Sequence, residues 1–279
     1  MNRQSTTAIL GFQRPPETGV LFNTVRGTHV KERAVKVRAV VFDLGYTLWD
    51  VEYSGETAAY VRVRRRLIEA LGETVPDAQT LRNAVAAVFL RETNEWLLQG
   101  KLEQLPTEEV FRQGFADVGL NVPEALLRRM GDWILGAGIR YTVDPETPPA
   151  LRSLKERGLR LGAVSNTYQS RGSLRRRLSE HGLLRYLDTL VISSEVGLAK
   201  PHSAIFQAAL EKLGVAAAET VFVGDIVWAD VLGAQALGMR AVLTHQYRQD
   251  DPGESRPELV INRLAEVVEY VDRLNSEDA

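Results

Sequence analysis

The chain has 279 residues, 44% hydrophobic and 25% charged, which is ordinary globular composition and excludes wholesale disorder and collagen-like repeats. It contains no cysteine, which excludes disulfides, thiolate catalysis and cysteine-ligated metal sites. The formal net charge is −2 and no apolar run approaches the length of a membrane span, so we expect neither a nucleic-acid partner nor membrane insertion. A cytoplasmic enzyme or binding protein is the class that remains, and nothing in the sequence indicates its oligomeric state.

The first 36 residues differ from the rest of the chain. They hold Pro15 and Pro16, several Gly and Thr residues, and no continuous apolar core of the kind that a secretory signal needs. We therefore interpret residues 1–36 as an N-terminal tail that is poorly ordered or packs on the edge of the domain.

After this tail, short apolar runs alternate with longer helical patterns, which is typical of βαβ units. The pattern predicts an α/β, Rossmann-like fold: a mainly parallel sheet with helices on both faces. The strands are expected at 37–42, 159–164, 189–192, 220–223 and 240–243, with an edge strand at 259–261, and the helices near 146–157, 168–181, 201–213, 229–238 and 263–274.

The interval between the first two strands exceeds a hundred residues, which is too long for one crossover helix. It reads as four helices, near 56–71, 77–98, 106–118 and 123–139, and Gly or Pro residues separate them. We therefore expect an inserted all-helical domain at 53–143. The sheet-containing core would then comprise residues 37–52 and 144–279.

Polar residues follow several of the predicted strands. Because the carboxyl ends of parallel strands meet at one edge of the sheet, these side chains should share one small volume. They are Asp43, Ser165, Lys200, Asp225 and Asp230.

Three carboxylates gathered in this way repel one another unless a cation lies between them. The chain offers oxygen ligands there and no cysteine, which favours a hard ion such as Mg²⁺. Lys200 and the Ser165 hydroxyl add donors suited to a phosphoryl oxygen. The residues alone thus predict a Mg²⁺-assisted site for a phosphorylated ligand.

The same segments resemble the four signature motifs of the haloacid dehalogenase superfamily, whose members are mostly phosphatases. Segment 43–47 (DLGYT) is similar to the first motif, 164–165 to the second, Lys200-Pro201 to the third, and Gly224-Asp225 with Asp230 to the fourth. The helical insert lies where that superfamily carries its helical C1-type cap. The resemblance covers about residues 37–250.

The resemblance implies a catalytic role for each matching residue. Asp43 would be the nucleophile and would form an aspartyl-phosphate that water then hydrolyses. Thr47 and Ser165 would hydrogen-bond the nucleophile and the phosphoryl group. Lys200 would offset the charge on both. The substrate would be a small phosphorylated molecule.

It also implies a Mg²⁺ site. The ligands would be Asp43, the backbone carbonyl of Gly45 and Asp225, and Asp230 would ligate through water or orient the set. Ser165, Asn166 and Lys200 would bind the substrate, although Asn166 could equally serve a structural purpose.

Arg64 is a further candidate substrate-binding residue. It lies near the centre of the apolar face of an insert helix. Its guanidinium either pairs with an acidic neighbour or extends to the solvent at the edge of the apolar face. Alternatively, it reaches the cleft and contacts an anionic substrate.

Gly45 departs from the family pattern, because phosphatases of the superfamily have a second Asp there that protonates the leaving oxygen and later activates water. Three hypotheses account for it: a phosphatase with restricted substrates or a replacement acid, an enzyme that cleaves a C–halogen or C–P bond, or a catalytically lapsed protein that binds a phosphorylated ligand or partner. Family dehalogenases use no metal and typically replace the fourth-motif Gly-Asp, which is intact here at Gly224-Asp225. Phosphonatases need a cap lysine, and Lys101, the one lysine of the insert, lies in a connection. Phosphatase chemistry is therefore the favoured interpretation.

Overall fold

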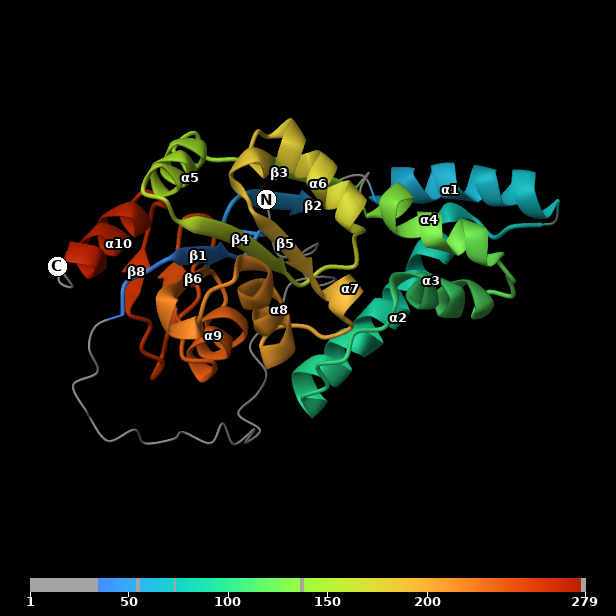
Figure 1. The fold of residues 1–279 in the computed structure, drawn as a ribbon. Coiled ribbons are helices and arrows are strands. Elements are labelled where there is room, and N and C mark those ends of the chain that lie inside the picture. Colours follow the sequence, from blue (N-terminus) through green and yellow to red (C-terminus); the bar gives the residue numbers. More distant parts are fainter. Residues whose placement is uncertain (1–34, 54–55, 73, 136–137, 277–279) are drawn as a thin grey trace, which may run out of the picture. The chain divides into compact units, whose positions relative to one another are not determined.

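The computed structural model describes residues 35–53, 56–72, 74–135 and 138–276 (Figure 1). All but two residues of the tail expected at 1–36 lie outside this range. The described residues form two compact units. The helical unit contains Val51–Tyr141 and Thr167–Leu174; the core unit contains Thr142–Asn166, Arg175–Ala279 and the chain up to Asp50, in so far as these are described.

The core unit is built on a six-stranded sheet in the order β5-β4-β1-β6-β7-β8, and every neighbouring pair is parallel. This confirms the predicted α/β, Rossmann-like fold. The strands are β1 (Ala39–Phe42), β4 (Arg160–Ser165), β5 (Thr189–Ile192), β6 (Thr220–Gly224), β7 (Arg240–Thr244) and β8 (Leu259–Ile261).

Strand β1 lies at the centre of the sheet because it is apolar on both faces. Its four residues (AVVF) are all buried, as a strand covered on both sides requires. Val41 pairs with Gly162 of β4 and with Phe222 of β6. Gly162 has little room for a side chain, since a Cβ there would come within 3.0 Å of the Thr189 methyl group.

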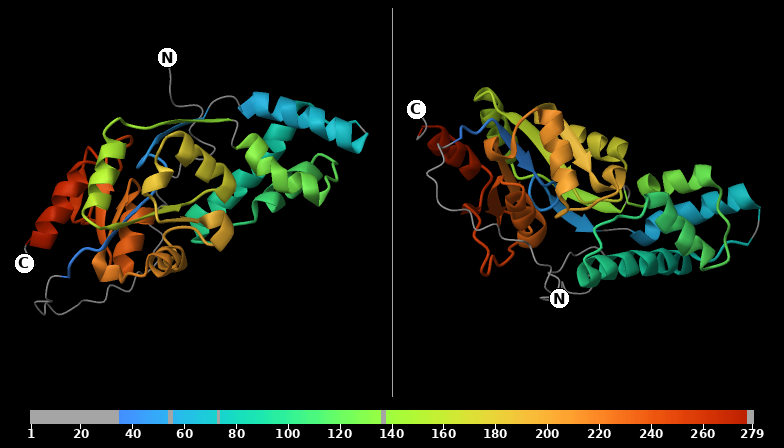
Figure 2. Two further views of the ribbon diagram at one scale, coloured as in Figure 1. Left: turned by 45° about the horizontal axis from the view of Figure 1, so that its top comes forward. Right: turned by 60° about the horizontal axis from the view of Figure 1, so that its bottom comes forward.

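Helices cover both faces of this sheet (Figures 1 and 2). On one face an apolar cluster joins the sheet to α8 and α9, and within it the rings of Phe206 and Phe222 meet edge to face at 5.1 Å. Helices α5 and α10 lie on the other face. The helices of this part of the chain are α5 (Thr147–Glu156), α6 (Arg171–Glu180), α7 (Ser193–Val196), α8 (Ser203–Leu213), α9 (Leu232–Ala236) and α10 (Glu266–Ser276).

The helix expected at 229–238 has a different start and end. The chain first makes a π-helical turn, η4 (Val227–Val231), and continues as α9 to Ala236. Such turns insert one extra residue per turn and are frequent at functional sites. Here the turn carries Asp230.

The helical unit contains α1 (Glu56–Leu71), α2 (Ala78–Gln99), α3 (Thr107–Ala116) and α4 (Glu124–Ile134). The first three match the predicted helices and the fourth is shorter than predicted. The apolar faces of all four meet in one cluster that includes Leu67, Val85, Phe111 and Met130. Among the described residues, no helix combines the length and apolarity that crossing a membrane demands.

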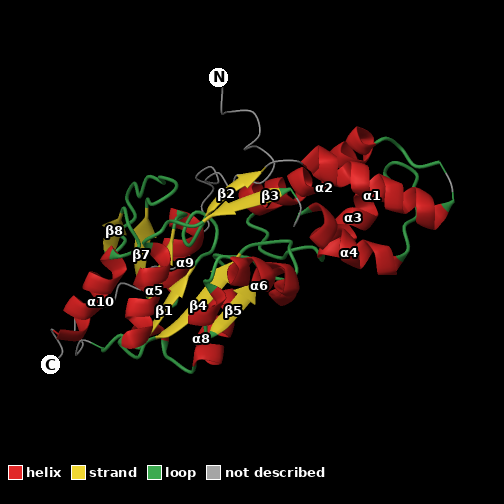
Figure 3. Ribbon diagram, turned by 90° about the horizontal axis from the view of Figure 1, so that it is seen from above, coloured by secondary structure: helices red, strands yellow, loops and turns green. Residues whose placement is uncertain are grey.

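One prediction for this part of the chain is wrong. The fourth helix was expected to continue to residue 139 but ends at Ile134, and Ile139–Thr142 forms strand β3, which pairs with β2 (Asp50–Tyr53) (Figure 3). The sequence between them is rich in glycine, which weakens a helix. The β3 residues IRYT include β-branched and aromatic side chains that favour a strand.

Candidate active site

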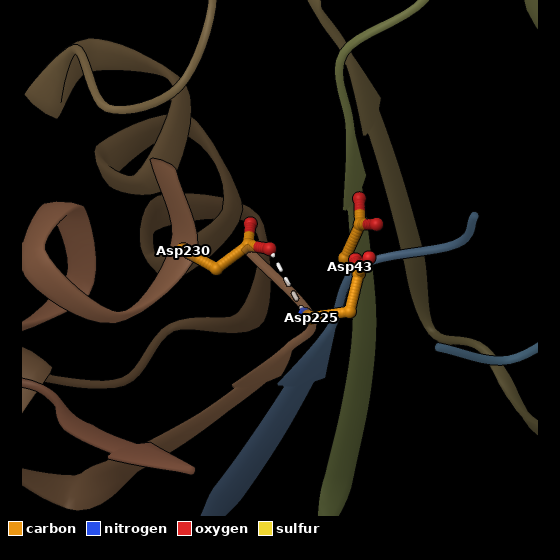
Figure 4. Close-up of side chains that lie close together, drawn as sticks. All are labelled: Asp43, Asp225 and Asp230. Carbon is orange, nitrogen blue, oxygen red and sulfur yellow. Dashed lines mark hydrogen bonds between the residues drawn. The ribbon is translucent and has the colours of Figure 1, made fainter. Parts of the chain in front are cut away.

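Three carboxylates gather at the carboxyl ends of two adjacent strands (Figure 4). Asp43 follows β1, Asp225 follows β6, and Asp230 belongs to the turn η4. Each is buried, and one oxygen from each lies within 4.8 Å of the other two. The Asp43 amide donates a 2.8 Å hydrogen bond to the carbonyl of Val223, which fixes the two strand ends side by side. The sequence prediction that these carboxylates meet is therefore confirmed by the geometry.

Asp230 is held by the backbone amides of the two residues that directly follow β6. Its Oδ2 accepts hydrogen bonds from the amides of Asp225 (3.1 Å) and Ile226 (2.9 Å). The carboxyl also lies against Gly224, where an added Cβ would overlap it. Glycine at this position is thus required by a close approach. Asp230 orients the loop that carries Asp225.

Lys200 joins two of the carboxylates. Its Nζ lies 2.6 Å from Oδ1 of Asp43 and 2.6 Å from Oδ1 of Asp230, and its side chain is only 3% exposed. Asn166 fixes the backbone of Lys200 from both sides, because Asn166 Oδ1 accepts from the Lys200 amide (2.8 Å) and Asn166 Nδ2 donates to the Lys200 carbonyl (3.1 Å). The structure therefore supports the structural alternative that the sequence left open for Asn166, namely that it positions Lys200; its substrate contact stays a prediction.

The other residues of the first and second motifs surround this cluster. Thr47 is buried, and its hydroxyl lies 3.5 Å from Oδ1 of Asp225. Ser165 ends β4, the strand that pairs with β1 on the side away from β6, and is also buried. Gly45 begins a tight turn in which the Tyr46 amide donates to the Trp49 carbonyl at 2.7 Å.

Burial sets the protonation of these groups. It raises the pKa of Asp43 to about 6, with Lys200 lowering that value and Asp230 raising it. It also raises the pKa of Asp225 well above its ordinary value, against the opposing effect of Arg248. For Lys200, burial lowers the pKa, but Asp230 and Asp43 outweigh it and the lysine stays charged. Burial thus disfavours the ionised forms of Asp43 and Asp225, and a cation bound between the carboxylates would favour them.

Arg248 is a site residue that the sequence analysis missed. Its Nη2 forms an ion pair with Oδ2 of Asp225, and its guanidinium carbon lies 4.7 Å from the centre of the Tyr46 ring. It belongs to the loop after β7, outside the four motifs. The available signal was its position after a strand of the same sheet, at the edge where the other site residues collect.

Arg64 lies in the helical unit, and its hydrogen bonds are to backbone carbonyls of that unit. Its Nε donates to the Pro76 carbonyl at 2.8 Å and its Nη2 to the Val75 carbonyl at 3.1 Å. These bonds tie α1 to the segment before α2. A substrate contact by Arg64 stays a prediction.

Comparison with known proteins places this site in a family. Residues 37–238 match the haloacid dehalogenase-like hydrolases. The chain belongs to that family. This hydrolase is 32% identical to the phosphoserine phosphatase of Thermus thermophilus over 236 residues, which is 82% of this chain and 90% of that protein.

Two solved structures are also similar to this haloacid dehalogenase-like hydrolase. The HAD phosphatase from Thermococcus onnurineus is 26% identical with a TM-score of 0.55, over 84% of this chain and 98% of that one. The 2-haloacid dehalogenase from Pseudomonas syringae pv. Tomato DC3000 is 25% identical with a TM-score of 0.61, over 85% and 99%. The resemblance drawn from the motifs is thereby confirmed, and the chain is a hydrolase whose relatives include both phosphatases and dehalogenases.

Proposed function

We propose that this hydrolase is a Mg²⁺-dependent phosphatase that acts on a small phosphorylated molecule and uses Asp43 as its nucleophile. The observation that carries the proposal is the buried cluster of Asp43, Asp225 and Asp230 with Lys200 bonded to two of its members. A dehalogenase needs no metal, whereas three buried carboxylates with oxygens within 4.8 Å of one another suit a bound cation.

The donor set at this site fits a magnesium ion. It consists of oxygen atoms alone: Asp43 and Asp225 would be direct ligands, the Gly45 carbonyl a third, and Asp230 a ligand through water or the orienting group. If all are ionised, the three carboxylates are paired with two cations among the residues that the structure describes, Lys200 and Arg248. Mg²⁺, when bound, would supply the missing positive charge and stabilise the oxygens of the transferring phosphoryl group.

In the first step, a carboxylate oxygen of Asp43 attacks phosphorus while the bond to the leaving oxygen breaks, and the electron pair of that bond stays on the leaving oxygen. Lys200 keeps Asp43 ionised and oriented by its 2.6 Å contact. Thr47 and Ser165 would hydrogen-bond the phosphoryl oxygens. In the second step, water attacks phosphorus, loses its proton to solvent, and releases phosphate and the Asp43 carboxylate.

Gly45 has no proton to give to the leaving oxygen. General acid catalysis contributes about 10²–10⁴-fold to a rate, so leaving groups that need a proton should be cleaved slowly. Carboxylate and phenolate leaving groups depart without one. We therefore expect acyl and aryl phosphates to be better substrates than alkyl phosphates.

The test measures phosphate release from acetyl phosphate and from glycerol 3-phosphate with Mg²⁺, using the wild type, Asp43→Asn and the matched control Asp251→Asn. Asp251 is an exposed aspartate of the same unit. We expect turnover of acetyl phosphate that Asp43→Asn reduces by about 10⁴-fold or more and Asp251→Asn leaves unchanged. No release from either substrate would contradict the proposal and favour a protein that only binds phosphorylated ligands.

A gain-of-function variant tests the role of Gly45 directly. Gly45 does not adopt a positive φ, so its backbone accepts an aspartate. Gly45→Asp should raise glycerol 3-phosphate hydrolysis by about 10²-fold or more while changing acetyl phosphate hydrolysis little. An unchanged ratio of the two rates would mean that the proton comes from elsewhere.

Dehalogenation is the second candidate, favoured by the similarity to the Pseudomonas syringae dehalogenase and by Gly45. It predicts halide release from (S)-2-chloropropionate that is insensitive to EDTA. Halide release without phosphate release would replace the phosphatase proposal with this one.

A further inference from the structure

Arg248 is held at the site by more than its charge. Its guanidinium pairs with Asp225 on one side and lies over the Tyr46 ring on the other, and all three residues belong to the core unit. The Asp225 side chain is 1% exposed, whereas that of Arg248 is 29% exposed. The arginine therefore reaches inward from the solvent side to a carboxylate that is otherwise enclosed.

The loop that carries Arg248 is fixed to the core by the side chains on both sides of it. His245 Nε2 lies 3.1 Å from the Asp250 carbonyl, and Asp250 Oδ2 accepts a 2.7 Å hydrogen bond from the amide of Val227, in the turn that carries Asp230. Gln246 and Tyr247 bind the backbone of two further segments, each at 2.7 Å. Because the loop is anchored in this way, the position of Arg248 beside Asp225 is built into the fold.

Lys200 and Arg248 pair with different members of the three carboxylates. Lys200 contacts Asp43 and Asp230 but not Asp225, whose Oδ2 is left to Arg248. A divalent ion bound by Asp43 and Asp225 would share the Asp225 carboxylate with the Arg248 guanidinium. Two cations on one largely buried carboxylate repel each other strongly. The ion and the arginine therefore cannot both hold Asp225 in the same way.

We propose that Arg248 is the resident counter-cation of Asp225 and competes with the divalent metal, which must displace the guanidinium from this carboxylate in order to bind. This rests on the proposed function in one respect, namely that the same carboxylates hold Mg²⁺. Displacement is feasible because Arg248 is the more exposed partner and its stack on Tyr46 does not involve Asp225. Lys200, which is buried and bonded twice, stays in place when the metal binds.

The experiment is calorimetric titration of Mg²⁺ into metal-free protein in the absence of substrate, for the wild type, Arg248→Gln and the matched control Arg263→Gln. Arg263 is an arginine of the same unit whose ion pairs are exposed. Arg248→Gln should bind Mg²⁺ about five- to tenfold more tightly, because Asp225 has lost its competing partner. The control should match the wild type.

A second readout separates direct competition from a general charge effect. Raising NaCl to about 0.5 M screens long-range repulsion but acts little on a contact at a buried carboxylate, so most of the affinity difference should persist. In EDTA, Arg248→Gln should also melt at a lower temperature than the wild type and gain more from added Mg²⁺.

The possible failures are distinguishable. Equal or weaker Mg²⁺ binding by Arg248→Gln, or a difference that vanishes at high salt, would overturn the competition and leave the phosphatase proposal intact. No Mg²⁺ binding by any variant would overturn the metal site itself, and with it the proposed function.

Discussion

The two compact units of this hydrolase bury different kinds of side chain. In the core unit, four buried ionisable residues form one connected cluster: Asp43, Lys200, Asp225 and Asp230. In the described part of the helical unit, the buried cluster is hydrophobic and Glu92 is the one buried acidic or basic side chain. Burying charged groups costs desolvation free energy, and in the core unit these groups are buried at the candidate active site. The helical unit is stabilised mainly by packing.

The largest expected effect is a loss of stability, and it distinguishes the charge pairing of the core unit from the packing of the helical unit. Lys200→Met removes the cation from two buried carboxylates, and Phe111→Ala opens a cavity beside Phe89 and Phe115. Each should lower the free energy of unfolding by about 3–5 kcal/mol. Only the first loss should be partly restored by Mg²⁺, because a divalent ion replaces charge and does not fill a cavity. Urea unfolding in EDTA and in excess Mg²⁺ measures both, and an equal response of the two variants to Mg²⁺ would contradict the comparison.

The core unit was the more predictable from sequence. Its strands are short, continuous apolar runs, and residues 189–192 and 259–261 were predicted without error. A strand buried on both faces, such as β1, admits few residues that are not apolar. The carboxyl ends of parallel strands meet at one edge of the sheet, so the sequence alone predicted that Asp43, Asp225 and Asp230 lie together.

What escaped prediction depends on contacts between distant segments. The pairing of β2 with β3 joins residues almost ninety positions apart, and neither run is long enough to signal a strand by itself. The position of Arg248 after a strand is too weak a signal by itself, since one arginine in a loop of a chain rich in arginine is ordinary. Its importance arises only when the fold sets it against Asp225 and Tyr46.

The second prediction concerns Gly224, whose backbone lies against the Asp230 carboxyl. In Gly224→Ala the new methyl group would overlap the Asp230 carboxyl, which must then give up its hydrogen bonds to the amides of Asp225 and Ile226. We expect a loss of about 1–3 kcal/mol in stability, together with weaker Mg²⁺ binding. Gly172 is the matched control in the other unit, since its added Cβ meets only the Ser170 hydroxyl, at 3.8 Å.

Thermal unfolding and Mg²⁺ titration of both glycine variants check this expectation. Gly172→Ala should lose no stability and should bind Mg²⁺ like the wild type. If Gly224→Ala kept wild-type metal affinity, the orienting role assigned to Asp230 would be wrong.

The smallest expected effect lies in the helical unit, where Lys101 faces two carboxylates in unlike surroundings. Its Nζ is 3.9 Å from Glu92 and 2.6 Å from Glu95. Burial raises the pKa of Glu92, while the hydrogen bond from Lys101 lowers the pKa of Glu95. A carboxyl with a raised pKa contributes to stability at low pH, and this contribution is lost as pH rises through its folded pKa. A carboxyl with a lowered pKa contributes to stability above its unfolded pKa, which is about 4.3 for Glu.

Glu92→Gln and Glu95→Gln should therefore have opposite pH dependences. As pH rises from about 4 to about 8, Glu92→Gln should gain stability relative to the wild type, because the substituted amide is never ionised in its buried position. Glu95→Gln should lose stability over the same range, since the wild type gains the ion pair with Lys101 that the variant lacks. Melting temperatures across this range give the two slopes. Parallel curves would mean that Lys101 offsets the burial of Glu92 and lowers its pKa as it lowers that of Glu95.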